Sequence, residues 1–315
     1  MRMTFGDITL LGASHSPFVG VDIANIPAGI RIGDEDFEQA LSRRRSGAKG
    51  TTPRREADLP LIERGIAEGV TTGATIRILF ANNDTRPADY SRFESQPRPG
   101  HADYVSRIKY GKVFPGGGIF SGRMTLPLVA ASVVLKAAMP PSVSICAQLE
   151  RDENFDRRLD AAIAAGDSIG ATVRCECRGV PAGLGEPFFD SLEGTIARLV
   201  FAIPGVRGIE FGDGFAASAM LGSSHNDPIV DAEGHTSRNG AGGINGGISN
   251  GNPIVFRVAF KPTSSISREQ RTFDFSAGEV KAMKTAGRHD ACFALRTPPV
   301  VEAAATIALW TAMHS

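Results

Sequence analysis

The chain has 315 residues, of which 42% are hydrophobic, so it is long enough to fold around a substantial apolar core. Its 34 basic and 34 acidic residues cancel to zero formal net charge, which argues against broad electrostatic binding to nucleic acid or an anionic membrane. No stretch reaches the ~20 apolar residues of a membrane span, and none at the start has signal-peptide length, so we expect a cytoplasmic protein.

The first predicted elements are two strands and a helix. Apolar residues at 8–11 and at 18–24 predict strands on either side of a polar turn. Asp34 is the predicted N-cap of a helix with acidic residues in its first turn, and the helix should end at the basic run Arg43-Arg44-Arg45. The chain therefore opens with a strand–turn–helix unit.

A second unit of the same kind is predicted later. Residues 171–177 alternate as a strand does, and residues 190–203 have helical spacing. Each unit carries a Pro-Ala-Gly turn, at 27–29 and at 181–183, which indicates an internal duplication, although this tripeptide is also a common turn. Two such halves would bury their sheets on each other or on their helices, which predicts a layered α/β fold.

The boundary between the halves is predicted at Pro140-Pro141. Residues 126–138 are rich in Val, Ala and Leu without an acidic residue, which predicts a buried helix that ends at this proline pair. We therefore expect one domain over residues 1–315, with halves of about 1–140 and 141–315. Glycine and asparagine crowd residues 234–251, which predicts a loop that either links strands or lets the backbone approach a ligand.

The cysteines lack the paired spacing of metal ligands. Cys175 and Cys177 alternate as two residues on the same face of a strand would. We expect all four to be reduced packing residues rather than ligands of a metal. They are Cys146, Cys175, Cys177 and Cys292.

Arginine, histidine and glycine gather in polar loops between apolar segments. Converging guanidinium groups would bind a substrate with phosphate and carboxylate groups, although any one arginine alone is more typical of a solvated surface. His15 and His101 could act as general acids beside such an anion, and either alone could be structural. The loops are Ser14-His15, Arg43-Arg44-Arg45, Arg98-Pro-Gly-His101, Ser121-Gly-Arg123 and Arg288-His-Asp290.

Two further loops have the composition of anion or ring sites. Gly116-Gly-Gly118 would let backbone amides face a phosphate or a planar ring, though three glycines alone are weakly specific. Lys261-Pro-Thr-Ser-Ser265 offers one ammonium group and three hydroxyls, which suit a phosphate tail, or else it is an ordinary turn after a strand.

In their order along the chain and in their residues, these loops together resemble the chorismate synthase family over nearly the whole chain. The matching segments are Gly12-Ala-Ser-His-Ser16, Arg43-Arg-Arg-Ser-Gly47, Thr51-Thr-Pro-Arg-Arg55, Arg98-Pro-Gly-His-Ala-Asp-Tyr104, Lys109-Tyr-Gly111, Gly116-Gly-Gly118, Gly179-Val-Pro-Ala-Gly-Leu-Gly-Glu-Pro187, Gly242-Gly-Ile-Asn-Gly-Gly-Ile-Ser-Asn-Gly251, Lys261-Pro-Thr-Ser-Ser265 and Gly287-Arg-His-Asp290.

The resemblance implies a layered β-α-β sandwich that acts as a lyase. The family's reaction is the 1,4-anti elimination of phosphate from 5-enolpyruvylshikimate-3-phosphate to give chorismate, with reduced FMN and no net redox change. An external flavin reductant and a homotetramer, or a homodimer, are implied as well. Two alternatives stay open: a paralogue acting on a related enolpyruvyl or cyclohexene phosphate, and a non-catalytic binding or assembly homologue with a weakened flavin site.

The resemblance also implies roles for individual residues. His15 would meet the pyrimidine edge of the flavin, His101 would act as the acid toward the departing phosphate, and Asp290 would remove the ring proton together with flavin nitrogen-5. The implied substrate ligands are Ser14, Arg44, Arg98, Ser121, Arg123 and Arg288. The implied flavin contacts are Gly246, Lys261, Pro262, Thr263, Ser264, Ser265 and Arg288. No metal is implied.

Departures from the family pattern lie mainly on the flavin side. An Arg-Ser pair of the family is Ile119-Phe120 here, and an Asn-Ala pair is Pro204-Gly205. In the opening motif, Ala13 replaces an acidic residue of the family and Ser16 replaces a glycine. A second basic position of the family falls on or beside Lys49, and the middle of the chain is shorter than in typical members. We expect weaker FMN binding that depends more on bound substrate, unless Phe120 packs on the flavin ring.

Overall fold

The computed structural model describes residues 2–52, 57–82, 87–285, 287 and 289–314. Arg288, one of the predicted ligands, lies outside the described residues. Within these ranges, no helix combines the length and the apolar composition that crossing a membrane requires.

The first sheet comes from the N-terminal part of the chain and is antiparallel throughout. Its central strands bury alternate side chains, among them Val19, Val21 and Phe80, which have no exposed surface. The predicted strands at 8–11 and 18–24 are confirmed. The strands are, in spatial order, β1 (Arg2–Phe5), β2 (Ile8–Gly12), β3 (Phe18–Ile23), β7 (Ile76–Ala81) and β4 (Leu61–Arg64).

The second sheet is also antiparallel and shows a clear alternation. Val173, Cys175 and Cys177 are fully buried, whereas the residues between them lie on the outer face. The predicted strand at 171–177 is confirmed. The strands are, in spatial order, β10 (Val206–Phe211), β13 (Ile254–Phe260), β9 (Ala171–Arg178) and β8 (Ser144–Leu149).

One expectation about the cysteines is wrong. All four are free thiols, as expected, but Cys146 is exposed and does not pack in the core. It lies on β8 next to the buried Ala147, so alternation places it on the outer face of the sheet. The burial of Cys175, Cys177 and Cys292 is confirmed.

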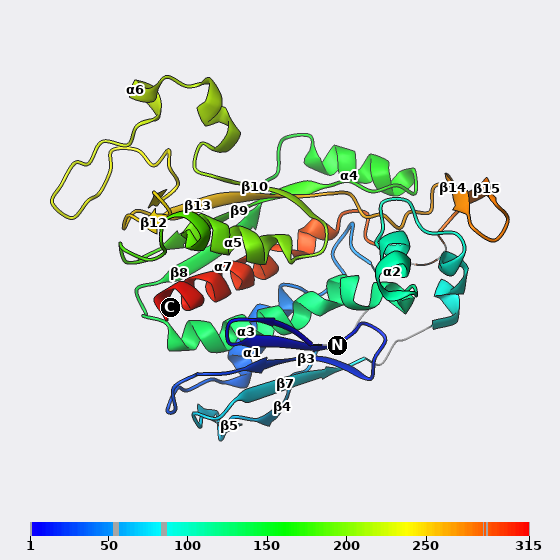
Figure 1. The fold of residues 1–315 in the computed structure, drawn as a ribbon, viewed down its shortest axis with the longest axis horizontal. Helices are drawn as coiled ribbons and strands as arrows, with labels where there is room; N and C mark the ends of the chain where they lie inside the picture. The colour runs from blue at the N-terminus through cyan, green and yellow to red at the C-terminus, as the bar shows by residue number, and fades with distance from the viewer. Residues whose placement is uncertain (1, 53–56, 83–86, 286, 288, 315) are drawn as a thin grey trace.

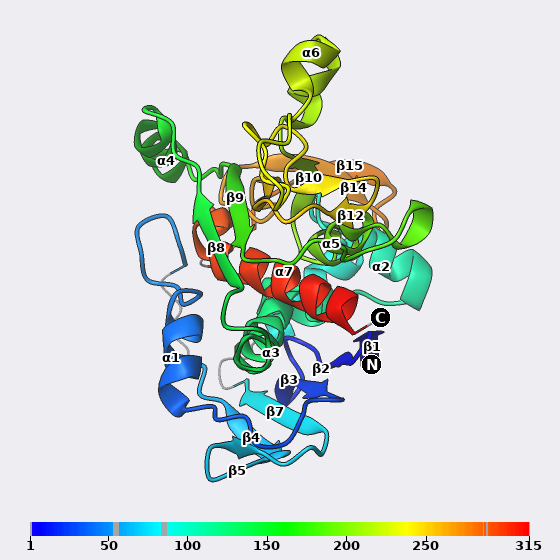
Figure 2. The same cartoon turned by 90° about the vertical axis from the view of Figure 1, so that its left-hand side faces the viewer.

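Helices fill the space between the two sheets, which confirms the β-α-β sandwich. Figures 1 and 2 show α3 (Thr125–Ala138) and α7 (Pro298–Met313) running between the sheets, with α1 (Asp34–Ser42) and α5 (Leu192–Phe201) beside them. Both α3 and α7 are buried on nearly every side, because each contacts helices and strands all round. The predicted buried helix at 126–138 is thus confirmed, and Met139 leaves it in an extended conformation before the proline pair.

The cap of α1 differs from the prediction. The N-cap is Gly33 rather than Asp34, because the carboxylate of Asp36 accepts a hydrogen bond from the Gly33 N–H at 2.8 Å. The helix predicted over 190–203 is α5, which begins two residues later because Ser191 caps it through Gly194 N.

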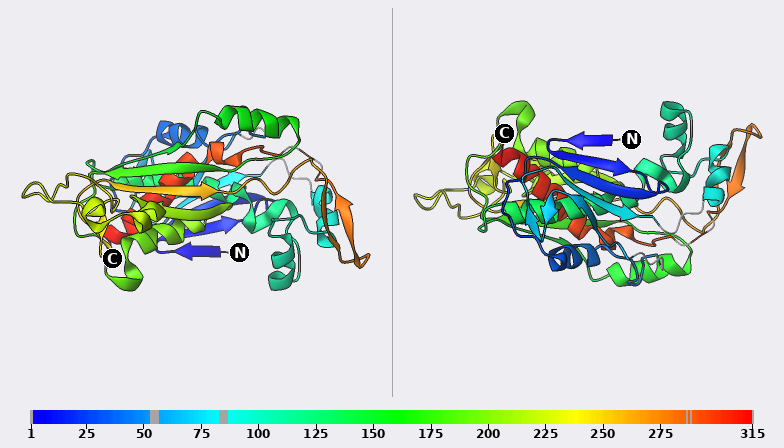
Figure 3. Two further views of the ribbon diagram at one scale, coloured as in Figure 1. Left: turned by 90° about the horizontal axis from the view of Figure 1, so that it is seen from above. Right: turned by 90° about the horizontal axis from the view of Figure 1, so that it is seen from below.

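The remaining elements lie around the sandwich. The loop predicted at 234–251 is largely irregular and contains one short hairpin. Figure 3 shows that α6 and the β14–β15 hairpin extend from opposite ends of the long axis. These elements are β5 (Ile66–Ala67), β6 (Val70–Thr71), α2 (Asp103–Tyr110), α4 (Phe155–Ala164), α6 (Gly222–His225), β11 (Ile244–Asn245), β12 (Ile248–Ser249), β14 (Gln270–Asp274) and β15 (Glu279–Met283), with 3-10 turns at 87–94, 115–120, 122–124, 188–190, 214–219 and 293–296. The division into duplicated halves at the proline pair stays a prediction.

A buried carboxylate ties the two parts of the sandwich together beside the site. Glu302 on α7 is 3% exposed and accepts two hydrogen bonds from Arg43, at 2.7 and 2.8 Å. It also accepts one from Ala147 N on β8 at 2.8 Å. Arg43 thus reaches this carboxylate, whereas the neighbouring Arg44 lines the cavity described below.

Candidate active site

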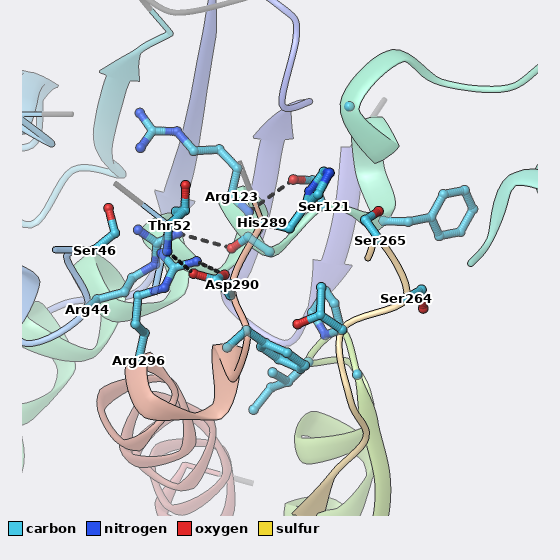
Figure 4. A pocket seen from close by; sticks show the side chains of 18 of the residues that line it. Arg44, Ser46, Thr52, Ser121, Arg123, Ser264, Ser265, His289, Asp290 and Arg296 are labelled. Carbon is cyan, nitrogen blue, oxygen red and sulfur yellow. Dashed lines mark hydrogen bonds and ion pairs between the residues drawn. The ribbon is translucent and has the colours of Figure 1, made fainter. Parts of the chain in front are cut away.

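One large cavity opens where α3 and α7 begin. Its volume is about 1180 Å³, which exceeds the ~300–1,000 Å³ typical of a pocket for one drug-sized ligand. The amino ends of two long helices favour negative charge there. The cavity therefore has room for two ligands and a field suited to anions. Figure 4 shows its labelled side chains, and the lining comes mainly from residues 44–47, 57–59, 98–102, 119–123, 201–207, 261–265 and 289–296.

Two arginines share one buried carboxylate on this wall. Asp58 Oδ2 accepts a hydrogen bond from Arg44 Nη1 at 3.3 Å, and Asp58 Oδ1 accepts one from Arg123 Nη1. The other nitrogens of Arg44 donate to Thr125 Oγ1 and to the carbonyl of Gly122, each at 3.0 Å. Arg44 and Asp58 are only 5% and 7% exposed. The two guanidinium groups are therefore fixed in position with a net positive charge, as a phosphate or carboxylate site requires.

A buried Arg–Asp pair holds His101. Asp103 is 1% exposed, and its two oxygens accept hydrogen bonds from Arg98 Nε and Nη2, both at 2.8 Å. Asp103 Oδ1 also lies 2.6 Å from His101 Nδ1. The carboxylate therefore accepts a hydrogen bond from the Nδ1–H group, which leaves Nε2 for the cavity. Arg98 donates further to Ser265 Oγ at 3.0 Å, so its contacts fix the histidine loop.

Opposing effects set the pKa values of His101 and Asp103. Burial lowers the pKa of His101 below its usual 6.5, and the positive charges of Arg98 and Lys261 add to that effect, while Asp103 opposes it. Burial raises the pKa of Asp103, but the hydrogen bonds from Arg98 and His101 outweigh it and hold that pKa well below its usual value. Asp103 is thus a permanent carboxylate, and the charge of His101 depends on what binds beside it.

Asp290 is held from two directions. Its Oδ1 accepts a hydrogen bond from Thr52 N at 2.6 Å, and its Oδ2 accepts one from Arg296 Nη2 at 2.6 Å. Figure 4 shows these three residues together with Arg44 and Arg123 on one side of the cavity, while Ser264 and Ser265 lie on the other. The carboxylate is therefore oriented within a cationic part of the wall.

The 261–265 loop lies against the histidine loop. Lys261 Nζ donates to Ser264 Oγ at 2.7 Å and to the carbonyl of Gly100, which Ser264 Oγ also contacts at 2.8 Å. Thr263 Oγ1 is a buried atom with no hydrogen-bond partner in the described part of the chain. The loop therefore lines the cavity with an ammonium group and, within the described part of the chain, an unpartnered hydroxyl, a donor set that fits a phosphate group.

The structure brings most, but not all, of the predicted site residues to the cavity. Most of them line the cavity: Arg44, Arg98, His101, Ser121, Arg123, Lys261, Pro262, Thr263, Ser264, Ser265 and Asp290. His15 lies behind the glycine loop, where a Cβ on Gly116 would come within 1.9 Å of its Cε1, and Ser14 Oγ lies 3.1 Å from its Nδ1. Gly246 lies in the turn between β11 and β12, outside the lining. Arg288 is not among the described residues.

The altered loop also faces the cavity. Ile119 and Phe120 both line it. The ring of Phe120 packs against Phe114 and Tyr110, with 6.3 Å between ring centroids in each case. Phe120 is thereby part of an aromatic cluster that shapes the wall, and its predicted contact with a flavin stays a prediction.

Several residues of the site were missed. Asp58, Thr52, Arg296 and Arg207 line the cavity, and none was predicted as a site residue, although Thr52 belongs to one of the matching segments. Asp103 belongs to the His101 motif but was not predicted as a site residue. Its position two residues after His101 was the signal that could have identified it as the partner of the histidine. For Asp58 the sequence offers no such signal, because its partner Arg123 is 65 residues away.

Comparisons with known proteins agree with this arrangement. A family model described as "Chorismate synthase" matches residues 7–150 and 141–314. The chain is 54% identical over 307 residues to a chorismate synthase of Chitinophaga pinensis, covering 96% of this chain and 92% of that protein. It is 39% identical over 349 residues to one of Synechocystis sp., covering 98% and 96%. A solved structure titled "Crystal Structure of Chorismate Synthase" superposes with a TM-score of 0.72 at 22% identity, covering 98% of this chain and 92% of that one, which shows the fold.

Proposed function

The chain belongs to the chorismate synthase family, and from that premise we propose how its cavity serves the family's reaction. That reaction is the elimination of phosphate from 5-enolpyruvylshikimate-3-phosphate to give chorismate. The observation that carries the proposal is the single cavity in which His101, Asp290 and the Arg44–Asp58–Arg123 cluster face the Lys261 loop. Identity of 54% to a curated chorismate synthase over nearly the whole chain favours an ordinary enzyme over a paralogue or a non-catalytic homologue.

Reduced FMN is the proposed cofactor. The Lys261 ammonium group and the Thr263 hydroxyl, which has no partner among the described residues, support a place for its phosphate, and the cavity volume supports room for its ring beside the substrate. When bound, the reduced flavin lends an electron and recovers it, so the reaction has no net redox change. We propose an external source for the reduced flavin.

Arg44 and Arg123 form the proposed substrate clamp, with Ser121 beside them. Their contacts with Asp58 hold both guanidinium groups before any ligand arrives, so binding costs little side-chain ordering. A phosphate or carboxylate of the substrate would add charge-assisted hydrogen bonds to this cluster. Phosphorylated, carboxylated small molecules are therefore the class of substrate that fits the wall.

His101 and Asp290 have the proposed proton roles. His101 holds its Nδ1 proton on Asp103 and would donate from Nε2 to the departing phosphate. Its pKa is lowered by burial, so the substrate's own negative charge is what would favour the protonated form at neutral pH. Asp290, oriented by Thr52 and Arg296, would accept the ring proton.

Assembly and location are further proposals. Phe188, Phe189 and Phe215 are 89%, 97% and 83% exposed, and large apolar side chains at the surface support contacts between subunits. We propose a homotetramer, or a homodimer, in the cytoplasm.

The proposed function predicts phosphate release that depends on reduced flavin. Under anaerobic conditions, the purified protein with reduced FMN and 5-enolpyruvylshikimate-3-phosphate should release phosphate and chorismate in equal amounts while the flavin stays reduced. Oxidised FMN should support no turnover, and reduced FMN without protein is the control. Flavin and substrate binding without phosphate release would point to a non-catalytic homologue. Release from a related enolpyruvyl phosphate alone would point to a paralogue.

A further inference from the structure

A β-bulge in β10 sets Arg207 apart from its neighbours. Val206 pairs with Phe260 and Gly208 pairs with Ala259, so Arg207 is an extra residue with no partner of its own on β13. Such bulges redirect a side chain and are common beside active sites. Arg207 lines the cavity, although no family motif quoted above includes it.

Lys261 lies beside this bulge, opposite Gly205. It follows Phe260 at the end of β13, and its N–H donates to the carbonyl of Gly205 at 2.9 Å. Burial lowers the pKa of Lys261, and the positive charge of Arg207 adds to that effect, as expected for two neighbouring cations. Neither side chain takes part in an ion pair within the described ranges, and Lys261 Nζ donates instead to neutral oxygens of Gly100 and Ser264. Two neighbouring positive charges are thus left without a negative partner in this part of the chain.

Hydroxyl groups complete this corner of the cavity. Ser264 Oγ lies 2.7 Å from Lys261 Nζ, and the Thr263 hydroxyl is buried without a hydrogen-bond partner in the described part of the chain. An orphaned buried hydroxyl costs free energy unless a ligand satisfies it. A phosphomonoester would satisfy it and would also remove the repulsion between the two cations.

We propose that Arg207 is a further ligand of the flavin phosphate, which it binds together with Lys261 and Thr263. The inference rests on the proposed function, since it takes FMN as the cofactor. The substrate also carries a phosphate, but its proposed clamp of Arg44 and Arg123 lies across the cavity from Ser264 and Ser265 (Figure 4). The Arg207 corner is therefore left for the flavin tail.

Riboflavin, which lacks the phosphate, isolates the contribution of this corner. Binding of reduced and oxidised FMN and of riboflavin would be measured by equilibrium titration in the wild type, in Arg207→Ala and in Arg207→Lys. We expect Arg207→Ala to weaken FMN binding roughly tenfold and to leave riboflavin binding unchanged, since a charged hydrogen bond from an exposed side chain is lost. Arg207→Lys should keep part of the affinity. Arg178→Ala, on the outer face of the second sheet, is the control and should change neither.

Each other outcome has a distinct meaning. Equal weakening of FMN and riboflavin would show a structural role for Arg207 and overturn the inference. An undiminished preference for FMN over riboflavin in Arg207→Ala would place the flavin phosphate elsewhere. Weakening of the phosphorylated substrate alone would assign the corner to the substrate. If the wild type binds neither flavin, with or without substrate, it is the proposed flavin-dependent function that fails, and the assignment of Arg207 fails with it.

Discussion

Replacing His101 by alanine is expected to lower the rate of phosphate release by roughly 10²–10⁴-fold, the range for loss of a positioned general acid. Asp103 Oδ1 lies 2.6 Å from His101 Nδ1 and accepts its hydrogen bond, so the side chain is oriented to donate from Nε2. Alanine leaves the Arg98–Asp103 pair in place, and substrate and FMN binding should therefore change far less than turnover.

The control for this variant is another histidine with the same kind of partner. His235 lies 2.7 Å from Asp231 but is exposed and does not line the cavity. His235→Ala should keep wild-type turnover. Equal rates in His101→Ala and the wild type would contradict the assigned acid role.

The pH dependence supplies a second readout of the same role. Burial lowers the pKa of His101 below 6.5, so the protonated form in the free protein is lost as pH rises through a value under 6.5. The ratio kcat/KM, which reports the free protein, should fall over that range. Bound substrate adds negative charge and raises the pKa, so kcat should fall only at higher pH. Identical falling limbs for kcat and kcat/KM would argue against this coupling.

Asp58→Asn is expected to lower the free energy of unfolding by about 3–5 kcal/mol, the cost of breaking a buried ion pair by removing one charge. Arg44 and Asp58 are both almost fully buried, and Arg123 would lose the same partner. Asparagine is the suitable replacement, because Asp58 has a φ of +50°, a conformation that asparagine tolerates better than most residues. Inorganic phosphate should stabilise this variant more than the wild type, since it can replace the lost negative charge.

Urea unfolding with and without phosphate would measure both effects. Asp160→Asn is the matched control: Asp160 pairs with Lys49 at 2.5 Å, but both side chains are more than half exposed. Such surface pairs contribute only about 0–1 kcal/mol. A loss in Asp58→Asn no larger than in this control would show that Asp58 does not hold the arginine cluster together.

The sequence predicted best those elements whose pattern is local. The strand at 171–177 and the helix at 126–138 follow from alternation and from an unbroken apolar run, and both are present. No prediction covered β7 or β13, which lie inside the two sheets and find their neighbours through pairing distant in sequence. The exposure of Cys146 was missed for a related reason: the face of a strand is fixed by its register, which the sequence alone left open.

The candidate site shows the same division. Family resemblance pointed to the loops of Arg44, His101, Arg123 and Lys261, and the structure brings them to one cavity. The contacts that orient these residues were not predictable in this way. Thr52, for example, meets the predicted Asp290 across 238 residues, and only the folded sandwich brings them together. Gly246 was predicted at the flavin, yet it lies outside the cavity of its own chain, and its role stays a prediction.

A crystal structure with FMN and 5-enolpyruvylshikimate-3-phosphate bound together would test most directly the central claim that one cavity holds both ligands. We predict the flavin phosphate against Lys261 and Arg207, the substrate's anionic groups against Arg44 and Arg123, and His101 Nε2 within hydrogen-bond distance of the substrate phosphate. A flavin bound outside the cavity, or a substrate phosphate seated against Lys261 and out of reach of His101, would contradict the account.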